Sequence, residues 1–158
     1  MAADIFLKIE GIEGESKDTT HDGELELQHW NWSMANQGSM HAGQGGGTGK
    51  VHMGDFTFGI ITMKGSPKLQ DYCARGEHIP SATLTVRKAG GEQQEYLVYK
   101  FTDLLISSFS IAGAGDLPNE TISFNFTKIE GDYGVQDEKG VIASHVKWGY
   151  DLKLNKKV

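Results

Sequence analysis

The segment Gly43–Lys50, with the sequence GQGGGTGK, comes closest to a motif that does chemistry. A phosphate-binding loop of this kind needs glycine five residues before the Gly-Lys pair and a hydroxyl residue directly after the lysine, and a helix follows it. Gln44 and Val51 occupy these two positions, and the residues beyond them alternate as in a strand. The sequence therefore argues against nucleotide binding.

The remaining reactive side chains show no spacing typical of a metal or catalytic site. None of the six histidines belongs to an HExxH or His-x-His pattern, and Cys73 is the only cysteine. The chain has no Gly-x-Ser-x-Gly turn, and the acidic residues between Glu13 and Glu26 lack the spacing of a calcium loop. We expect no metal, no cofactor and no catalytic residues, and thus a protein that is not an enzyme.

Charge and composition exclude further classes of function. The formal net charge is −6, whereas binding to nucleic acid needs a basic surface. A single cysteine suits a reducing compartment, and the first residues, Met1–Asp4, lack the basic and apolar regions of a signal peptide. No stretch approaches the ~18 apolar residues of a membrane span. We expect folding in the cytoplasm, no membrane insertion, and export only by a route that needs no signal peptide.

Alternation of apolar and polar residues with period two dominates the chain, as in half-buried strands. Glycine contributes 21 of 158 residues and proline only three, which places the glycine in the turns of a β-rich chain. The sequence predicts one mainly β domain over residues 1–158, an antiparallel β-barrel or two-sheet sandwich. The expected strands cover residues 5–10, 24–32, 56–61, 83–87, 96–101, 107–111, 121–129 and 141–154, with a hairpin turn at 89–92.

Two segments depart from this pattern. Pro67–Arg75 has apolar residues at helical spacing, with Ser66 as the expected N-cap and Gly76 as the C-terminal stop, so we expect one short α-helix with Cys73 on its apolar face. Ser33–Lys50 contains six glycines and no Val, Ile, Leu or aromatic residue. Such a long loop within one domain is generally functional or disordered.

Several segments together resemble one known family. They are Ile5–Asp18 (IFLKIEGIEGESKD), Trp30–Trp32 (WNW), Gly38–Val51 (GSMHAGQGGGTGKV), Ser66–His78 (SPKLQDYCARGEH) and Ala82–Leu97 (ATLTVRKAGGEQQEYL). The chain resembles the Hcp family, the haemolysin-coregulated proteins of bacterial type VI secretion. The resemblance is strong over residues 3–110 and continues mostly as a pattern through Asn119–Gly134 and the C-terminal strand.

The resemblance implies a β-barrel subunit with one flanking helix that assembles as a homohexameric ring. Rings of this family stack into the inner tube of a contractile machine, which is expelled through its sheath, and they hold small effector proteins in the lumen. Sheath, baseplate or spike, and effectors are therefore the implied partners. The subunit would stand in the bacterial cytoplasm before firing and be secreted afterwards. A phage tail-tube protein and a stand-alone small β-barrel with binding or hydrolytic activity are the alternatives.

Two groups of residues are candidates for these roles. In Trp30-Asn31-Trp32 the two indoles share one face of a strand and Asn31 takes the other, so this segment is the candidate lumen element. The alternative is that both indoles belong to the core, because Trp is usually substantially buried. The Gly-rich loop, Ser33–Lys50, is the candidate ring-stacking element. Its Lys50 and His41 are expected to contact acidic residues of the next ring, such as Glu13, Glu15 or Asp18. Its candidate residues are Gly38, Ser39, Met40, His41, Gly45, Gly46, Gly47 and Lys50.

Overall fold

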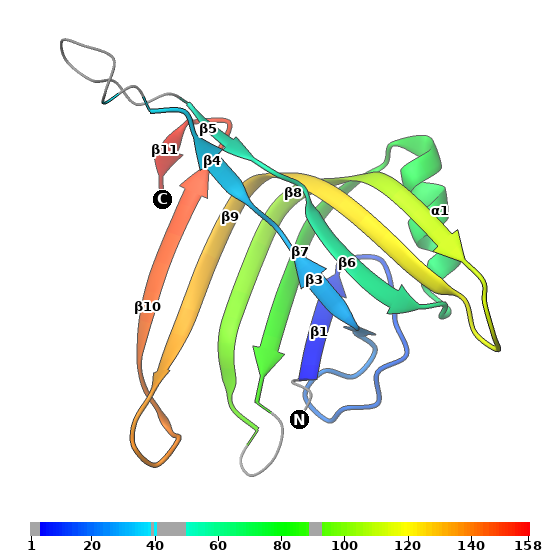
Figure 1. Cartoon of the computed structure of the whole chain (residues 1–158), viewed down its shortest axis with the longest axis horizontal. Coiled ribbons are helices and arrows are strands. Elements are labelled where there is room, and N and C mark those ends of the chain that lie inside the picture. The colour runs from blue at the N-terminus through cyan, green and yellow to red at the C-terminus, as the bar shows by residue number, and fades with distance from the viewer. Residues whose placement is uncertain (1–3, 39, 41–49, 89–92) are drawn as a thin grey trace.

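The computed structural model describes residues 4–38, 40, 50–88 and 93–158. Strands dominate the described chain, and one helix lies beside them (Figure 1). The elements, in chain order, are β1 (Asp4–Ile9), β2 (Leu25–Glu26), β3 (His29–Asn31), β4 (Met34–Asn36), β5 (Val51–Met53), β6 (Phe56–Ile61), α1 (Ser66–Arg75), β7 (His78–Arg87), β8 (Glu95–Ala112), β9 (Asn119–Gln136), β10 (Ile142–Asp151) and β11 (Lys156–Lys157).

The described strands form one nine-stranded antiparallel sheet and a separate pair, β4–β5. The main path of the sheet runs β11-β10-β9-β8-β7-β1-β2. It branches at β9, because the first part of β9 pairs with β6 and the later part pairs with β10. β3 then adds to the free side of β6. The two branches give β9 a different neighbour at each end.

The predicted antiparallel β fold is confirmed, but the sheet is not closed into one continuous barrel. The chain between β2 and β3 passes from β1, near one end of the main path, to β6 on the side branch. Leu27 N–H donates to Ile5 O at 3.0 Å, and the next residue, Gln28, donates to Gly59 O at 2.8 Å. Because this segment changes partner after so few residues, it bridges β1 and β6 without forming a full strand beside both.

Two segments predicted as separate strands, 96–101 and 107–111, are parts of the single 18-residue strand β8. Its pairing with β9 shifts register between Ile106 and Ser108, and Asp103 has a positive φ of 57°. Such irregularities bend a long strand. Figure 1 shows β8 and β9 curving across the whole molecule, so that one hairpin serves two sides of the core.

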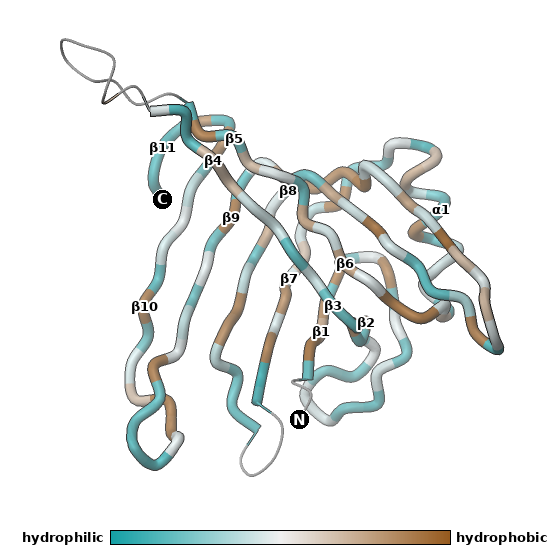
Figure 2. The backbone as a smooth tube through the Cα atoms, viewed as in Figure 1, coloured by the Kyte–Doolittle hydropathy of each residue, from teal (hydrophilic) through white to brown (hydrophobic). Residues whose placement is uncertain are grey.

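The core lies between the curved surfaces of the sheet. Its centre is aromatic: the ring of Phe56 lies 4.9 Å from that of Phe101 and 5.0 Å from that of Phe124, centroid to centroid. Hydropathy changes repeatedly along individual strands rather than from strand to strand, as Figure 2 shows. This is the expected signature of strands with one buried face. Cys73 is partly buried and packs against this core.

The helix is confirmed, although its N-terminus differs from the prediction. Gly65 is the N-cap and makes no side-chain capping bond, so the assignment of Ser66 as N-cap is wrong. Ser66 is the first helical residue, and its Oγ accepts a hydrogen bond from Met63 N–H at 3.0 Å. Gly76 ends the helix as predicted, with the left-handed φ of 64° that glycine adopts without strain.

Candidate functional site

Four segments from different parts of the chain lie side by side and share one exposed face. The register aligns Asn31 of β3 with Thr57 of β6, Thr57 with Ser123 of β9, and Ser123 with Ser108 of β8. Directly paired residues in an antiparallel sheet point to the same side. The row therefore carries one amide and three hydroxyl groups on one surface.

A second row runs beside the first, aligning His29, Gly59, Thr121 and Ser110. A Cβ at Gly59 would clash with the imidazole of His29, so the ring lies across β6 where only glycine leaves room. We call the surface formed by these rows and the next one the neutral face. It consists of His29, Asn31, Thr57, Gly59, Ile61, Ser108, Ser110, Ala112, Asn119, Thr121 and Ser123.

None of the eleven described residues of the neutral face is Asp, Glu, Lys or Arg. Charged residues make up 23% of the chain, so eleven average positions would hold about two or three. The hydroxyls of Thr57 and Ser123 hydrogen-bond to each other across the strands at 2.8 Å. The face thus offers hydrogen-bond donors and acceptors without formal charge.

The structure places the three candidate lumen residues on two different faces. Asn31 is exposed, whereas Trp30 and Trp32 are half-buried and pack against the core. Trp30 stacks on Phe56 with a centroid separation of 6.1 Å, and Trp32 stacks on Trp148 at 6.0 Å. The two indoles anchor the strand, and of the three residues only Asn31 belongs to the neutral face.

The β4–β5 pair, which we call the arm, carries the described part of the candidate stacking loop. It projects from the sheet, away from the N-terminus (Figure 1). Gly38, Met40 and Lys50 are exposed there. Ser39, His41, Gly45, Gly46 and Gly47 lie outside the described residues.

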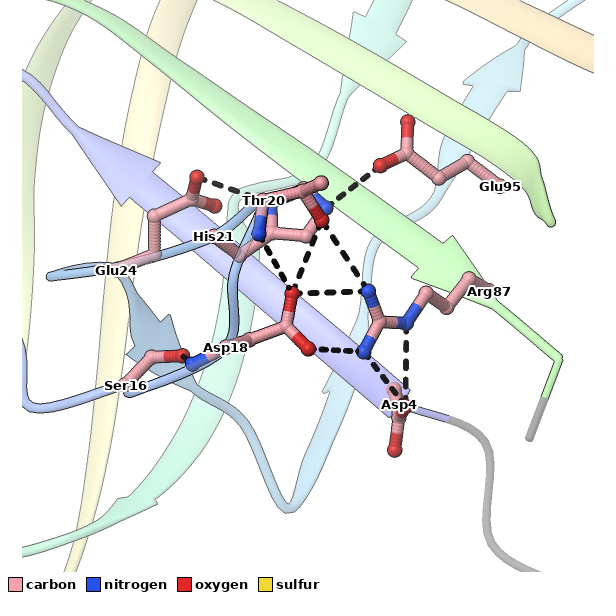
Figure 3. A network of polar contacts seen from close by, with 8 residues as sticks. All are labelled: Asp4, Ser16, Asp18, Thr20, His21, Glu24, Arg87 and Glu95. Atoms are coloured by element: carbon pink, nitrogen blue, oxygen red, sulfur yellow. Dashed lines mark hydrogen bonds and ion pairs between the residues drawn. The ribbon is translucent and has the colours of Figure 1, made fainter. Parts of the chain in front are cut away.

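A polar network holds the Glu10–Glu24 loop over β1 (Figure 3). Arg87 is only 5% exposed, and its guanidinium donates to the carboxylates of both Asp18 and Asp4. The hydrogen bonds from Arg87 hold the pKa of Asp18 well below its usual value, and those to Asp18 and Asp4 raise the pKa of Arg87. Arg87 is therefore an internal anchor of this loop.

His21 forms the second half of the network. Its Nδ1 lies 2.9 Å from Glu24 Oε2 and its Nε2 lies 2.6 Å from Glu95 Oε1. The imidazole stacks on the ring of Phe6 at 4.4 Å, and the Arg87 guanidinium lies 4.9 Å from the same ring. Phe6 is thereby buried on the surface of β1 opposite to Leu7, which belongs to the main core.

The acidic residues expected to receive the arm have partners within the subunit. Asp18 is bound by Arg87. Glu15 accepts a hydrogen bond from Lys64 N–H at 2.7 Å, and Glu13 lies 3.5 Å from Lys64 Nζ. Asp18 and Glu15 therefore hold the Glu10–Glu24 loop in the isolated subunit, whereas the exposed pair of Glu13 with Lys64 contributes little.

Sequence reasoning missed the anchoring roles of Arg87 and His21. The structure shows how closely the loop that they hold is packed, since a Cβ at Gly14 would clash with the backbone of Glu24. A glycine forced by close backbone approach marks a tightly packed loop. In the described part of the chain, no three His, Cys, Asp or Glu side chains converge as metal ligands would.

The described chain thus combines a branched open sheet, a neutral face and a projecting arm. Comparison with known proteins shows the family to which this chain belongs. The family model described as "Type VI secretion system effector, Hcp" matches residues 6–133. The chain is 43% identical to the protein hcp1 of Pseudomonas aeruginosa over 159 aligned positions, covering 98% of each.

Solved structures agree with this comparison. Hcp1 from Salmonella typhimurium superposes with a TM-score of 0.82 at 38% identity, over 100% of both chains. A type six secretion system protein superposes with a TM-score of 0.93 at 30% identity, over 99% of this chain and 100% of the other. The chain belongs to the Hcp family of type VI secretion proteins, which are secreted structural components of that system.

The described residues contain no helix that is both long and apolar enough to cross a membrane.

Proposed function

We propose that this protein is a subunit of the type VI inner tube, forming hexameric rings that stack, carry effectors in their lumen and leave the cell with the tube. The observation that carries the proposal is the unfinished edge of the sheet. β10 pairs with β11 at Tyr150 and Asp151, and Gly149 O accepts a hydrogen bond from Val158 N–H, so among the described residues the outer edge of 142–148 faces no strand. A free edge of this kind invites pairing with another chain.

Apolar side chains beside this edge support a contact between subunits. Val146 is 62% exposed and Tyr133, its partner across the strands, is 50% exposed. The end of the side branch is a different surface, where β3 pairs with β6 and with no other described strand. A contact between two different surfaces is heterologous and closes into a ring when the rotation allows. The number six comes from the family.

The arm supports stacking of rings. A two-stranded ribbon is only marginally stable by itself, and all three residues of β4 are exposed in the single subunit. Met34, opposite Met53 in the register, is 52% exposed. A neighbouring ring that receives the arm would cover these side chains. In this assignment Gly38, Met40 and Lys50 lie at the ring–ring contact, together with Ser39, His41, Gly45, Gly46 and Gly47.

We assign the neutral face, with Asn31, to the lumen, where effectors are held. Sheath and baseplate or spike would contact other surfaces of the assembled tube. This function requires no catalysis, no cofactor and no signal peptide, because contraction of the machine moves the subunit out of the cytoplasm. A phage tail tube shares the architecture, but the match to the Hcp family favours type VI secretion.

Two substitutions on opposite faces of β10 test the ring. Val146→Lys places a charge among the exposed apolar residues, whereas His145→Lys places the same side chain on the other face, beside Asp132. We expect hexamers for the wild type and for His145→Lys, and monomers for Val146→Lys, by native mass spectrometry. Negative-stain images should show rings with a central hole. A wild-type protein that is mainly monomeric at micromolar concentration contradicts the proposal and favours a stand-alone barrel.

A further inference from the structure

We propose that the neutral face holds its cargo through hydrogen bonds to uncharged groups, so that effectors of either net charge are carried equally well. The partner is a protein surface rich in backbone, amide and hydroxyl groups. This inference rests on the assignment of the neutral face to the lumen. Beyond the proposed function, it states that the net charge of an effector does not decide whether the lumen retains it.

The absence of charge is local to this face and does not reflect the strands as a whole. On other parts of the same sheet, charged residues stand directly opposite one another: Lys100 is paired with Glu130, and Lys147 with Asp132. On β9 these charged pairs lie in the half that pairs with β10, whereas in the half that pairs with β6 the one charged residue, Glu120, is buried and points to the opposite side. The sequence of each strand changes character where β9 changes partner from β10 to β6.

The rim of the neutral face is consistent with this assignment. At one end of β6 the nearest carboxylate is that of Asp55, the residue directly before the strand. The hydroxyl of Ser107 donates a hydrogen bond to this carboxylate. Ile61, 39% exposed, ends the strand on the opposite side. Between these two residues the exposed surface carries only neutral polar groups, the imidazole of His29 and small side chains.

Hydroxyl and amide groups both donate and accept hydrogen bonds. They can therefore match polar groups of either kind on a cargo, and neutral groups cost much less to desolvate than charges. A single patch of this kind holds cargo weakly, because each hydrogen bond replaces one to water. Six copies facing one lumen would supply the retention through multiple simultaneous contacts.

The test measures retention of two effectors of opposite net charge from the same secretion system, each co-expressed with this chain and purified on intact hexamers. For both effectors we expect the retained fraction to change by less than about twofold between about 50 and 500 mM NaCl, because added salt screens only charge–charge attraction. A loss of about tenfold for either effector at high salt, or retention of one charge class only, overturns the inference.

Thr121→Lys and Thr121→Gln provide the matched comparison, since Thr121 is exposed in the middle of the face. Thr121→Lys should lower retention of the basic effector about tenfold and make retention of the acidic one salt-dependent, whereas Thr121→Gln should affect both alike. Equal effects of the two variants on both effectors contradict the inference. Absence of hexamers, or hexamers that retain neither effector, overturns the proposed function itself.

Discussion

The guanidinium of Arg87 binds the carboxylate of Asp18 through two parallel hydrogen bonds, Nη1 to Oδ2 at 2.9 Å and Nη2 to Oδ1, across 69 residues of sequence. Paired contacts of this geometry are stronger and more directional than single ones. Thr20 adds a backbone and a hydroxyl hydrogen bond to the same carboxylate. The loop that covers β1 is therefore fastened at its middle to the last residue of β7.

This pair predicts a specific loss of stability in acid. Because the pKa of Asp18 is lowered in the folded protein, its contribution to the free energy of unfolding is complete above the ordinary pKa of 3.8 and is lost as the pH falls below that value. Chemical denaturation between pH 7 and pH 2 should show a steeper decline below about pH 4 for the wild type than for Asp18→Asn. The exposed neighbour Asp22 supplies the control, since Asp22→Asn should decline as the wild type does.

Arg87→Gln should destabilise the protein more than removal of an exposed arginine. The substitution leaves Asp18 and Asp4 without their shared cation, and we expect a loss of about 2–3 kcal/mol, because solvent reaches both carboxylates and moderates the cost of a broken buried pair. Thermal unfolding would then shift down by roughly 4–12 °C. The control is Arg75→Gln, which breaks the half-exposed pair with Asp71 and should change the midpoint little. Equal shifts for the two variants would contradict the anchoring role of Arg87.

The strands, the helix and its C-terminal glycine could be predicted because each depends on local periodicity. Ile5, Leu7 and Ile9 alternate over one strand, and Gly76 has the backbone conformation that ends a helix. The branch at β9 could not be predicted. Tyr133 and Ser123 lie in the same strand, but Tyr133 pairs with β10 and Ser123 pairs with β6, and no local sequence pattern distinguishes the two.

In the candidate site too, the features set by local alternation could be predicted and those set by distant strand pairing could not. Alternation alone separates Asn31 from its flanking indoles, and the structure has them on opposite faces. The neutral face is visible only once the register brings Thr57, Ser108 and Thr121 beside one another from three strands. The anchoring role of Arg87 could not be predicted, because alternation gives the side of a strand but not whether a distant loop covers it.

Asn31→Gln should weaken cargo retention without changing the hexamer. The added methylene moves the amide outward from the neutral face, away from the position that complements an effector, while Trp30 and Trp32 keep the strand anchored. Co-purification of an effector with hexamers should fall by roughly 5–20-fold, equivalent to about 1–2 kcal/mol. Ser108→Thr, in the same row, keeps the hydroxyl and should lower retention much less. Unchanged co-purification from intact Asn31→Gln hexamers would remove Asn31 from the binding surface.

The arm yields the last prediction, which concerns the Gly-rich segment between its strands. Deleting Gly43–Gly47 shortens the reach of the loop from the ends of β4 and β5, while the register Met34–Asn36 against Val51–Met53 stays available. We expect hexamers to form as in the wild type, because the free edge at β10 is untouched, but stacking and type VI-dependent secretion to be abolished. Six glycines in Ser33–Lys50 make ordering of this loop costly in conformational entropy, so the ring–ring contact should be weak and reversible.

A length-preserving variant separates reach from glycine content. Gly45→Ser, Gly46→Ser and Gly47→Ser together keep the loop polar and equally long, so secretion should persist, whereas the deletion should stop it. Native mass spectrometry reports the hexamer, negative-stain images report stacked tubes, and secretion is measured in the culture supernatant. Monomers from the deletion would assign the loop to the contact within a ring. Normal secretion from the deletion would show that the Gly-rich loop is a passive insertion and would contradict its proposed role in stacking.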